Sequence, residues 1–150
     1  MLLTLESIAL PSTMVLINWE SFCNCEKLKR IHINDVLRWI FSRAFAGCSS
    51  LEIIVLPSTV DFVDFPSEGI AFSPHLYPLL LTDKATEIFK GCSSLKRIVL
   101  PPYVKKIVTG AFKDCSSLEK IDLHEGLTEI RASAFEGCSS LESIVLPSSV

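Results

Sequence analysis

Apolar and polar residues recur along this chain with a period of 23 positions. The last block, residues 128–150 (TEIRASAFEGCSSLESIVLPSSV), places an Ile, an Ala-Phe pair, a Cys, a Leu and an Ile-x-Leu-Pro group in order and closes on Val. Residues 105–127 and 38–60 repeat this order position for position. A unit this short cannot bury its apolar face alone and must stack on neighbouring copies. The pattern therefore predicts a solenoid.

Each repeat contains the motif Leu-x-x-Ile-x-Leu, in which apolar positions are interleaved with exposed ones. Such alternation predicts a strand with one face toward the core. The Pro that follows the motif lacks an N–H group and ends the pairing of the strands. The motif predicts seven strands, which begin at Leu5, Leu28, Leu51, Leu76, Leu95, Leu118 and Leu141.

The repeats form a single predicted domain of seven units. Their boundaries are 1–14 (partial), 15–37, 38–60, 61–85 (irregular), 86–104 (shortened), 105–127 and 128–150. In the irregular part, residues 76–81 are predicted as the fourth strand. Residues 86–88 (Thr-Glu-Ile) align with residues 128–130, which leaves the shortened repeat four residues short before Phe89. The irregularity indicates either a functional loop on one face of the solenoid or the degeneration of one repeat.

Five of the six cysteines share one repeat position, and they are Cys25, Cys48, Cys92, Cys115 and Cys138. Stacking places their side chains in a parallel column at the strand spacing of about 4.8 Å. Disulfides need converging Cβ atoms, so the column predicts buried free thiols and favours a reducing compartment. By the same reasoning, Phe45, Phe112 and Phe135 are predicted to stack as a second column.

The composition restricts the class of partner. With 150 residues and 49% apolar content, the chain is long enough for one core. The formal net charge of -3 argues against a nucleic-acid partner. No apolar run approaches the roughly 18 residues of a membrane span. The start, MLLTLESIAL, lacks the basic region of a signal peptide. These features leave the compartment open and predict no membrane insertion.

The repeat resembles the BspA-like (Treponema-type) leucine-rich repeats, whose unit reads Leu-x-x-Ile-x-Leu-Pro-x-x-Val-x-x-Ile-x-x-x-Ala-Phe-x-x-Cys. The match is specific at 38–60, 105–127 and 128–150 and weak at 61–91. The resemblance implies an α/β leucine-rich-repeat solenoid, a right-handed superhelix with a parallel sheet on its concave face and short helical or irregular segments on its convex face. It also implies a cell-surface protein used for adhesion or protein–protein contact, with no shared catalytic residues. Both ends lack a polar cap, which predicts a fragment of a longer array or end-to-end self-association.

The exposed strand positions of the predicted concave sheet are the candidate ligand-binding site. Its middle is apolar and its rim is charged, which is typical of interaction surfaces. The candidate residues are Arg30, His32, Ile53, Val55, Tyr77, Leu80, Arg97, Val99, Lys120 and Asp122. β-Propensity alone also favours Val and Ile on a sheet, and that alternative stays open. The sequence predicts a protein or peptide ligand; the alternative function is a structural spacer in a longer surface or adhesin protein.

The sequence offers no catalytic, cofactor-binding or metal-binding motif. Cys23-x-Cys25 with His32 lacks the second ligand pair of a zinc site. The glycines are scattered and form no phosphate-binding loop. We therefore predict no enzyme activity, no cofactor and no metal. An enzyme would need a pocket with perturbed titratable groups in the irregular part, residues 61–91.

Overall fold

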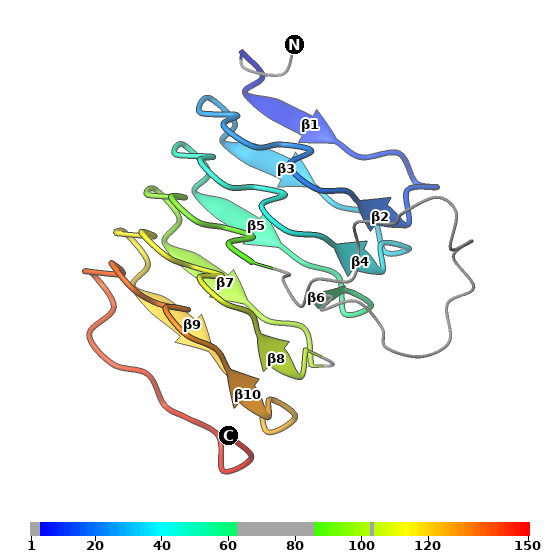
Figure 1. Cartoon of the computed structure of the whole chain (residues 1–150). Coiled ribbons are helices and arrows are strands. Elements are labelled where there is room, and N and C mark those ends of the chain that lie inside the picture. Colours follow the sequence, from blue (N-terminus) through cyan, green and yellow to red (C-terminus); the bar gives the residue numbers. More distant parts are fainter. Residues whose placement is uncertain (1–3, 63–85, 103) are drawn as a thin grey trace, which may run out of the picture.

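Successive turns of the backbone stack on one another in the computed structural model (Figure 1). The structure describes residues 4–62, 86–102 and 104–150. Five of the turns contribute one strand each to a parallel sheet with the order β1-β3-β5-β7-β9. The strands of this sheet are β1 (Ser7–Ala9), β3 (Arg30–His32), β5 (Ile53–Val55), β7 (Arg97–Val99) and β9 (Lys120–Asp122). The predicted parallel-sheet solenoid is therefore confirmed.

The register of the sheet pairs equivalent repeat positions. The central isoleucine of each strand lies beside the isoleucine of the next, as with Ile54 and Ile98 or Ile98 and Ile121. These three side chains are buried, and the residues that flank them along each strand project away from the core. The period-two alternation of the motif thus separates a buried row from two exposed rows.

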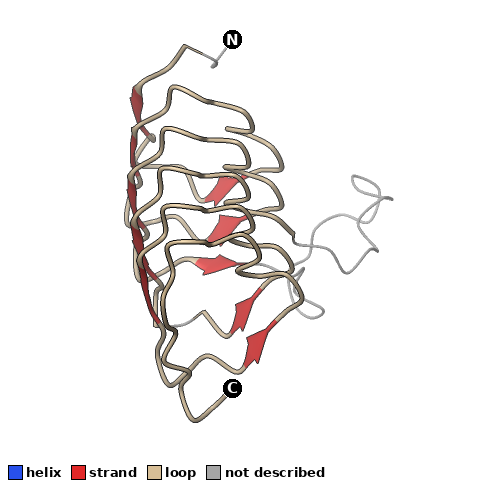
Figure 2. Ribbon diagram, turned by 90° about the vertical axis from the view of Figure 1, so that its left-hand side faces the viewer, coloured by secondary structure: helices blue, strands red, loops and turns tan. Residues whose placement is uncertain are grey.

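A second set of two-residue strands lies on the other side of the coil from the five-stranded sheet (Figure 2). They form a three-stranded sheet, β2-β4-β6, and a two-stranded sheet, β10-β8. Their bounds are β2 (Leu16–Ile17), β4 (Trp39–Ile40), β6 (Asp61–Phe62), β8 (Lys106–Ile107) and β10 (Glu129–Ile130). The described residues contain no helix, so the convex segments are turns and short strands.

The sheet corrects the predicted fourth strand. β5 pairs directly with β7, with Ile53 beside Arg97 and Val55 beside Val99. No place remains between these strands for residues 76–81, which lie outside the described residues. The physical reason is that the Cys and Phe columns continue directly from the turn of Phe45 to that of Phe89, so the next described turn stacks there without a gap.

The register at residues 86–88 also differs from the predicted alignment. Thr86 forms a bridge with Thr109, and the N–H of Phe89 donates to the carbonyl of Ala111 at 2.8 Å. Ile88 therefore takes the repeat position of Ala111, four positions from the predicted one. Ile88 is fully buried. Stacking of Phe89 on Phe112 sets this register, since a ring in the column determines where its neighbours in the chain must lie.

The predicted seventh strand does not form. Residues 141–147 have no strand pairing, although their sequence, LESIVLP, matches LEIIVLP at residues 51–57. Leu146 is 57% exposed, whereas its counterparts Leu56 and Leu100 are buried. A short strand is held mainly by packing of its side chains. In this segment Leu141 and Ile144 are only partly buried and Leu146 lies in solvent, so that packing is weaker here.

Two columns of side chains join the turns. The rings of Phe22, Phe45, Phe89, Phe112 and Phe135 stack in sequence, with centroids 5.4 to 5.6 Å apart and interplanar angles of 2° to 6°. This confirms the predicted phenylalanine column and adds Phe22 and Phe89 to it. The cysteine column is confirmed as well: its five thiols are free and buried.

Each cysteine of the column beyond the first donates a hydrogen bond to the preceding turn. The Cys48 thiol donates to the carbonyl of Phe22 at 3.1 Å, and the Cys115 thiol donates to that of Phe89 at 3.1 Å. Burial raises the pKa of the Cys48 and Cys115 thiols from an ordinary 9.0 to about 12. The column therefore consists of neutral thiols. From Cys48 onward, each thiol links its turn to the preceding one through a hydrogen bond to a backbone carbonyl.

Candidate functional site

The five-stranded sheet exposes two rows of side chains, which we call the sheet face. The first row contains Ser7, Arg30, Ile53, Arg97 and Lys120, and the second contains Ala9, His32, Val55, Val99 and Asp122. Because adjacent parallel strands lie about 4.8 Å apart, neighbours within a row lie side by side across the sheet. Residues far apart in the chain thereby form one surface.

The middle of the sheet face is apolar. Ile53, Val55 and Val99 are 60%, 73% and 52% exposed. Val55 and Val99 are directly paired, and Ile53 lies two residues before Val55 on the same side of β5. We call these three residues the apolar patch. Contiguous exposed apolar side chains with a charged rim are a common feature of interaction surfaces.

A charged cluster borders the apolar patch on the side of β9. Asp122 accepts hydrogen bonds from Lys120 at 2.9 Å and from Arg97 at 3.0 Å. The bond from Lys120, then that from Arg97, lowers the pKa of the Asp122 carboxyl below its ordinary 3.8. The cluster keeps one net positive charge at neutral pH.

Arg30 and His32 border the apolar patch on the side of β3. Both are exposed, and Arg30 makes no ion pair with any residue in the described ranges. A hollow of about 490 Å³ opens here, and its lining includes Ser7, Ala9, Arg30, His32, Ile53 and Val55. The hollow joins this basic end of the sheet face to the apolar patch.

Eight of the ten predicted site residues lie together on the sheet face. The other two, Tyr77 and Leu80, fall outside the described residues, and the pairing of β5 with β7 removes their predicted place between Val55 and Val99. Ser7 and Ala9 line the hollow but were not among the candidates. Their repeat positions, equivalent to those of Arg30 and His32, are the sequence signal that places them there.

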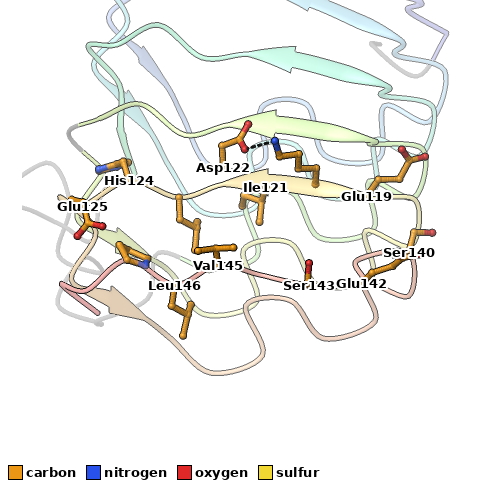
Figure 3. Close-up of a pocket in the computed structure, with 13 residues that line it drawn as sticks. Glu119, Ile121, Asp122, His124, Glu125, Ser140, Glu142, Ser143, Val145 and Leu146 are labelled. Atoms are coloured by element: carbon orange, nitrogen blue, oxygen red, sulfur yellow. Dashed lines mark ion pairs between the residues drawn. The ribbon is translucent and has the colours of Figure 1, made fainter.

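A second hollow, of about 790 Å³, lies between β9 and residues 140–147. Figure 3 shows Asp122, His124, Val145 and Leu146 around it, and its dashed line marks the ion pair of Asp122 with Lys120. The hollow exists because residues 141–146 do not pair with β9. Sequence reasoning missed it, since the repeat pattern predicts a strand in that place.

Within the described residues, the sheet face has binding groups but no reactive constellation. No three His, Cys, Asp or Glu side chains in this part of the chain are placed to hold a metal ion. The column thiols are buried, and burial raises their pKa, so they are poor nucleophiles. No helix in the described ranges is long and apolar enough to span a bilayer.

The comparisons with known proteins agree with this architecture. The sequence matches the family described as BspA type leucine rich repeat region, in six copies over residues 2–66 and 81–150. Among solved structures, it is similar to a leucine rich cell surface protein from Faecalibacterium prausnitzii, with 25% identity and a TM-score of 0.73. That match covers 91% of this chain and 31% of the other.

Two further structures are similar. The T. pallidum leucine rich repeat protein is 29% identical with a TM-score of 0.65, and the match covers 91% of this chain and 64% of that one. A leucine-rich repeat protein from Bacteroides ovatus is 27% identical with a TM-score of 0.62, and the match covers 96% and 38%. The chain thus spans less than two thirds of each. No curated protein matches the sequence significantly.

Proposed function

Because this chain belongs to the BspA-type leucine-rich repeat family, we propose that it binds a protein or peptide on its sheet face. The observation that carries the proposal is the apolar patch, in which three exposed aliphatic side chains occupy neighbouring positions on the same face of the sheet. Burying one such side chain completely stabilises a complex by about 1.5 to 3 kcal/mol. The protein already covers part of each of these three side chains, so a ligand gains less than this from each. The remainder of the binding free energy must come from polar contacts.

Strand formation alone does not account for the apolar patch. β1 carries Ser7 and Ala9 at the equivalent exposed positions, and β9 carries Lys120 and Asp122. Both form strands in the same sheet. Because the sheet tolerates polar and small residues at these positions, β-propensity does not require Ile53, Val55 and Val99. This supports binding as the reason for them.

The setting of the interaction is part of the proposal. The Faecalibacterium prausnitzii protein that this chain resembles is described as a cell surface protein. We place the module in the same setting, where it would serve adhesion or recognition of a macromolecule. A second candidate function is a spacer within a longer surface protein, which the unbroken Phe column favours.

Selection of peptides on the immobilised chain would test the proposal. A phage-displayed random peptide library is selected on the native chain and then on a Val55→Glu/Val99→Glu variant. A Val15→Glu/Val36→Glu variant is the matched control, because it adds the same charges at exposed valines outside the five-stranded sheet. Circular dichroism and thermal melting establish that all three proteins fold alike.

Peptides that bind the native chain and the control but not the sheet-face variant are the expected result. Val55→Thr/Val99→Thr provides a second variant that keeps the β-branched shape and so preserves the strands. It should weaken the selected peptides without loss of fold. Peptides held equally by all variants would place binding elsewhere, and failure to enrich any peptide would favour the spacer.

A further inference from the structure

The charge on the sheet face is opposite in sign to that of the whole chain. The two exposed rows contain three cationic side chains, Arg30, Arg97 and Lys120, and one carboxylate, Asp122. The chain as a whole has a formal net charge of -3. A surface patch of opposite sign to its protein selects partners by charge, because it attracts groups that the rest of the surface repels.

The positive charge lies at the two ends of the apolar patch. Arg30 pairs in register with Ile53, which in turn pairs with Arg97. Lys120 follows Arg97 on the next strand. Asp122 is shared between Arg97 and Lys120, so this end keeps one net positive charge. An aliphatic surface therefore lies between two cationic ends.

The carboxylates beside the sheet face oppose this charge unequally. Beyond β9, Glu125 and Glu142 line the second hollow together with Lys120, so they offset part of the positive charge on the outer side of that end. Glu6 is paired with Lys29 at 3.2 Å. Glu52 lines the same hollow as Arg30 but lies outside ion-pair distance of it in the described structure. Lys96 and Glu119 directly precede β7 and β9 at equivalent repeat positions, so their opposite charges offset each other. Glu52 is thus the main group that opposes an anion at Arg30.

On the basis of the function proposed above, we infer that the partner is an acidic extended peptide segment with an aliphatic side chain between two carboxylates. Arg30 and Lys120 lie three strand spacings apart, which is about 14 Å. An extended peptide rises about 3.3 Å per residue and points every second side chain to the same face. Carboxylates at i and i+4 then reach Arg30 and the Arg97–Lys120 end, and an aliphatic residue at i+2 covers the apolar patch.

The test uses three synthetic peptides titrated into the isotopically labelled full chain, with binding followed by the amide shifts of β5 and β7. The first is Glu-Val-Leu-Val-Glu, blocked at both termini. Lys-Val-Leu-Val-Lys reverses the charges, and Glu-Val-Ser-Val-Glu removes only the central aliphatic group. We expect the first to bind at least threefold more tightly than either of the others at low salt, and the difference to shrink at high salt.

Three charge variants locate the contact. Arg30→Gln should weaken the Glu-Val-Leu-Val-Glu peptide by about two- to fivefold, the usual effect of one exposed ion pair. Glu52→Gln should strengthen it by up to about twofold, because it removes the opposing charge near Arg30. Arg38→Gln is the matched control: Arg38 is also exposed but lies outside the sheet face, and its removal should leave the affinity unchanged.

Several outcomes would overturn the inference while the proposed function stands. Equal binding of the Lys and Glu peptides would show an apolar site without charge preference. Equal binding of the Ser peptide, or tighter binding of a single-stranded oligothymidylate, would show a general anion site. If no peptide of this set binds but the library selection enriches others on the sheet face, the partner has a different chemistry. If the selection enriches none, the proposed function fails as well.

Discussion

The thiol of Cys92 donates a hydrogen bond to the backbone carbonyl of Phe45 at 3.2 Å, although 47 positions separate the two residues. The equivalent bond between Cys115 and Phe89 spans 26 positions. The geometry is the same in both cases, so the stack of turns is continuous across the irregular part of the sequence.

The column thiols should resist alkylation. Cys23 is partly exposed, whereas Cys25, Cys48, Cys92, Cys115 and Cys138 are buried. Iodoacetamide needs an accessible thiolate, and burial removes both access and charge. We expect mass spectrometry of the native protein to show a single rapid modification, at Cys23, and all six after unfolding. Rapid modification of Cys92 in the native state would contradict the column.

The free energy of unfolding should fall at alkaline pH. The Cys48 and Cys115 thiols have a pKa raised from 9.0 to about 12 in the folded protein. Above pH 9 the unfolded chain loses these protons while the folded chain keeps them, so the stabilisation declines until pH 12. Denaturant titrations from pH 8 to 11 measure this slope.

A Cys48→Ala/Cys115→Ala variant is the control for the pH dependence. It should start from a lower stability, because two buried side chains are shortened. Its loss of stability with pH should nevertheless be shallower than that of the native chain. Parallel slopes for the two proteins would show that other groups cause the alkaline loss.

Truncation of the Phe column should cost most in its middle. Phe89 is fully buried between Phe45 and Phe112, so Phe89→Ala should lower the free energy of unfolding by about 3 to 5 kcal/mol. Phe135 is partly buried and stacks on Phe112 alone among the described residues, so Phe135→Ala should cost less. Chemical denaturation measures both values. An equal decrease in the free energy of unfolding for the two variants would argue against the Phe column as the main source of packing energy between turns.

The turn before each column cysteine should prefer glycine. Gly47 and Gly137 have φ of +74° and +76°, and Asp114 has φ of +61° at the equivalent position. Gly47→Ala should destabilise the protein by about 1 kcal/mol or more, because a Cβ is strained in this conformation and would also crowd Asn24. Asp114→Gly should be neutral or stabilising. Thermal melts should therefore show a lower melting temperature for Gly47→Ala and an unchanged or higher one for Asp114→Gly. A lower melting temperature for Asp114→Gly would contradict this prediction.

Most of the repeat architecture could be predicted from the sequence because its causes are local. Ile31, Ile54 and Ile98 are buried and their neighbours exposed, as the alternation within each motif requires. The shared position of the cysteines and of the phenylalanines predicted both columns, since stacking a repeat on itself aligns equivalent side chains. The same register brought eight of the candidate site residues to one face.

The positions of the irregular and terminal segments depended on packing between turns. Residues 76–81 carry a strand-like pattern, yet β5 and β7 pair directly, because Phe89 and Cys92 stack on the turn of Phe45 and Cys48. Residues 141–146 repeat a strand sequence but leave Leu146 in solvent. The alternation within each repeat is enough to predict which side chains of a turn face the core. Which turns become neighbours depends on packing between turns, and the pattern within one repeat carries no information about those contacts.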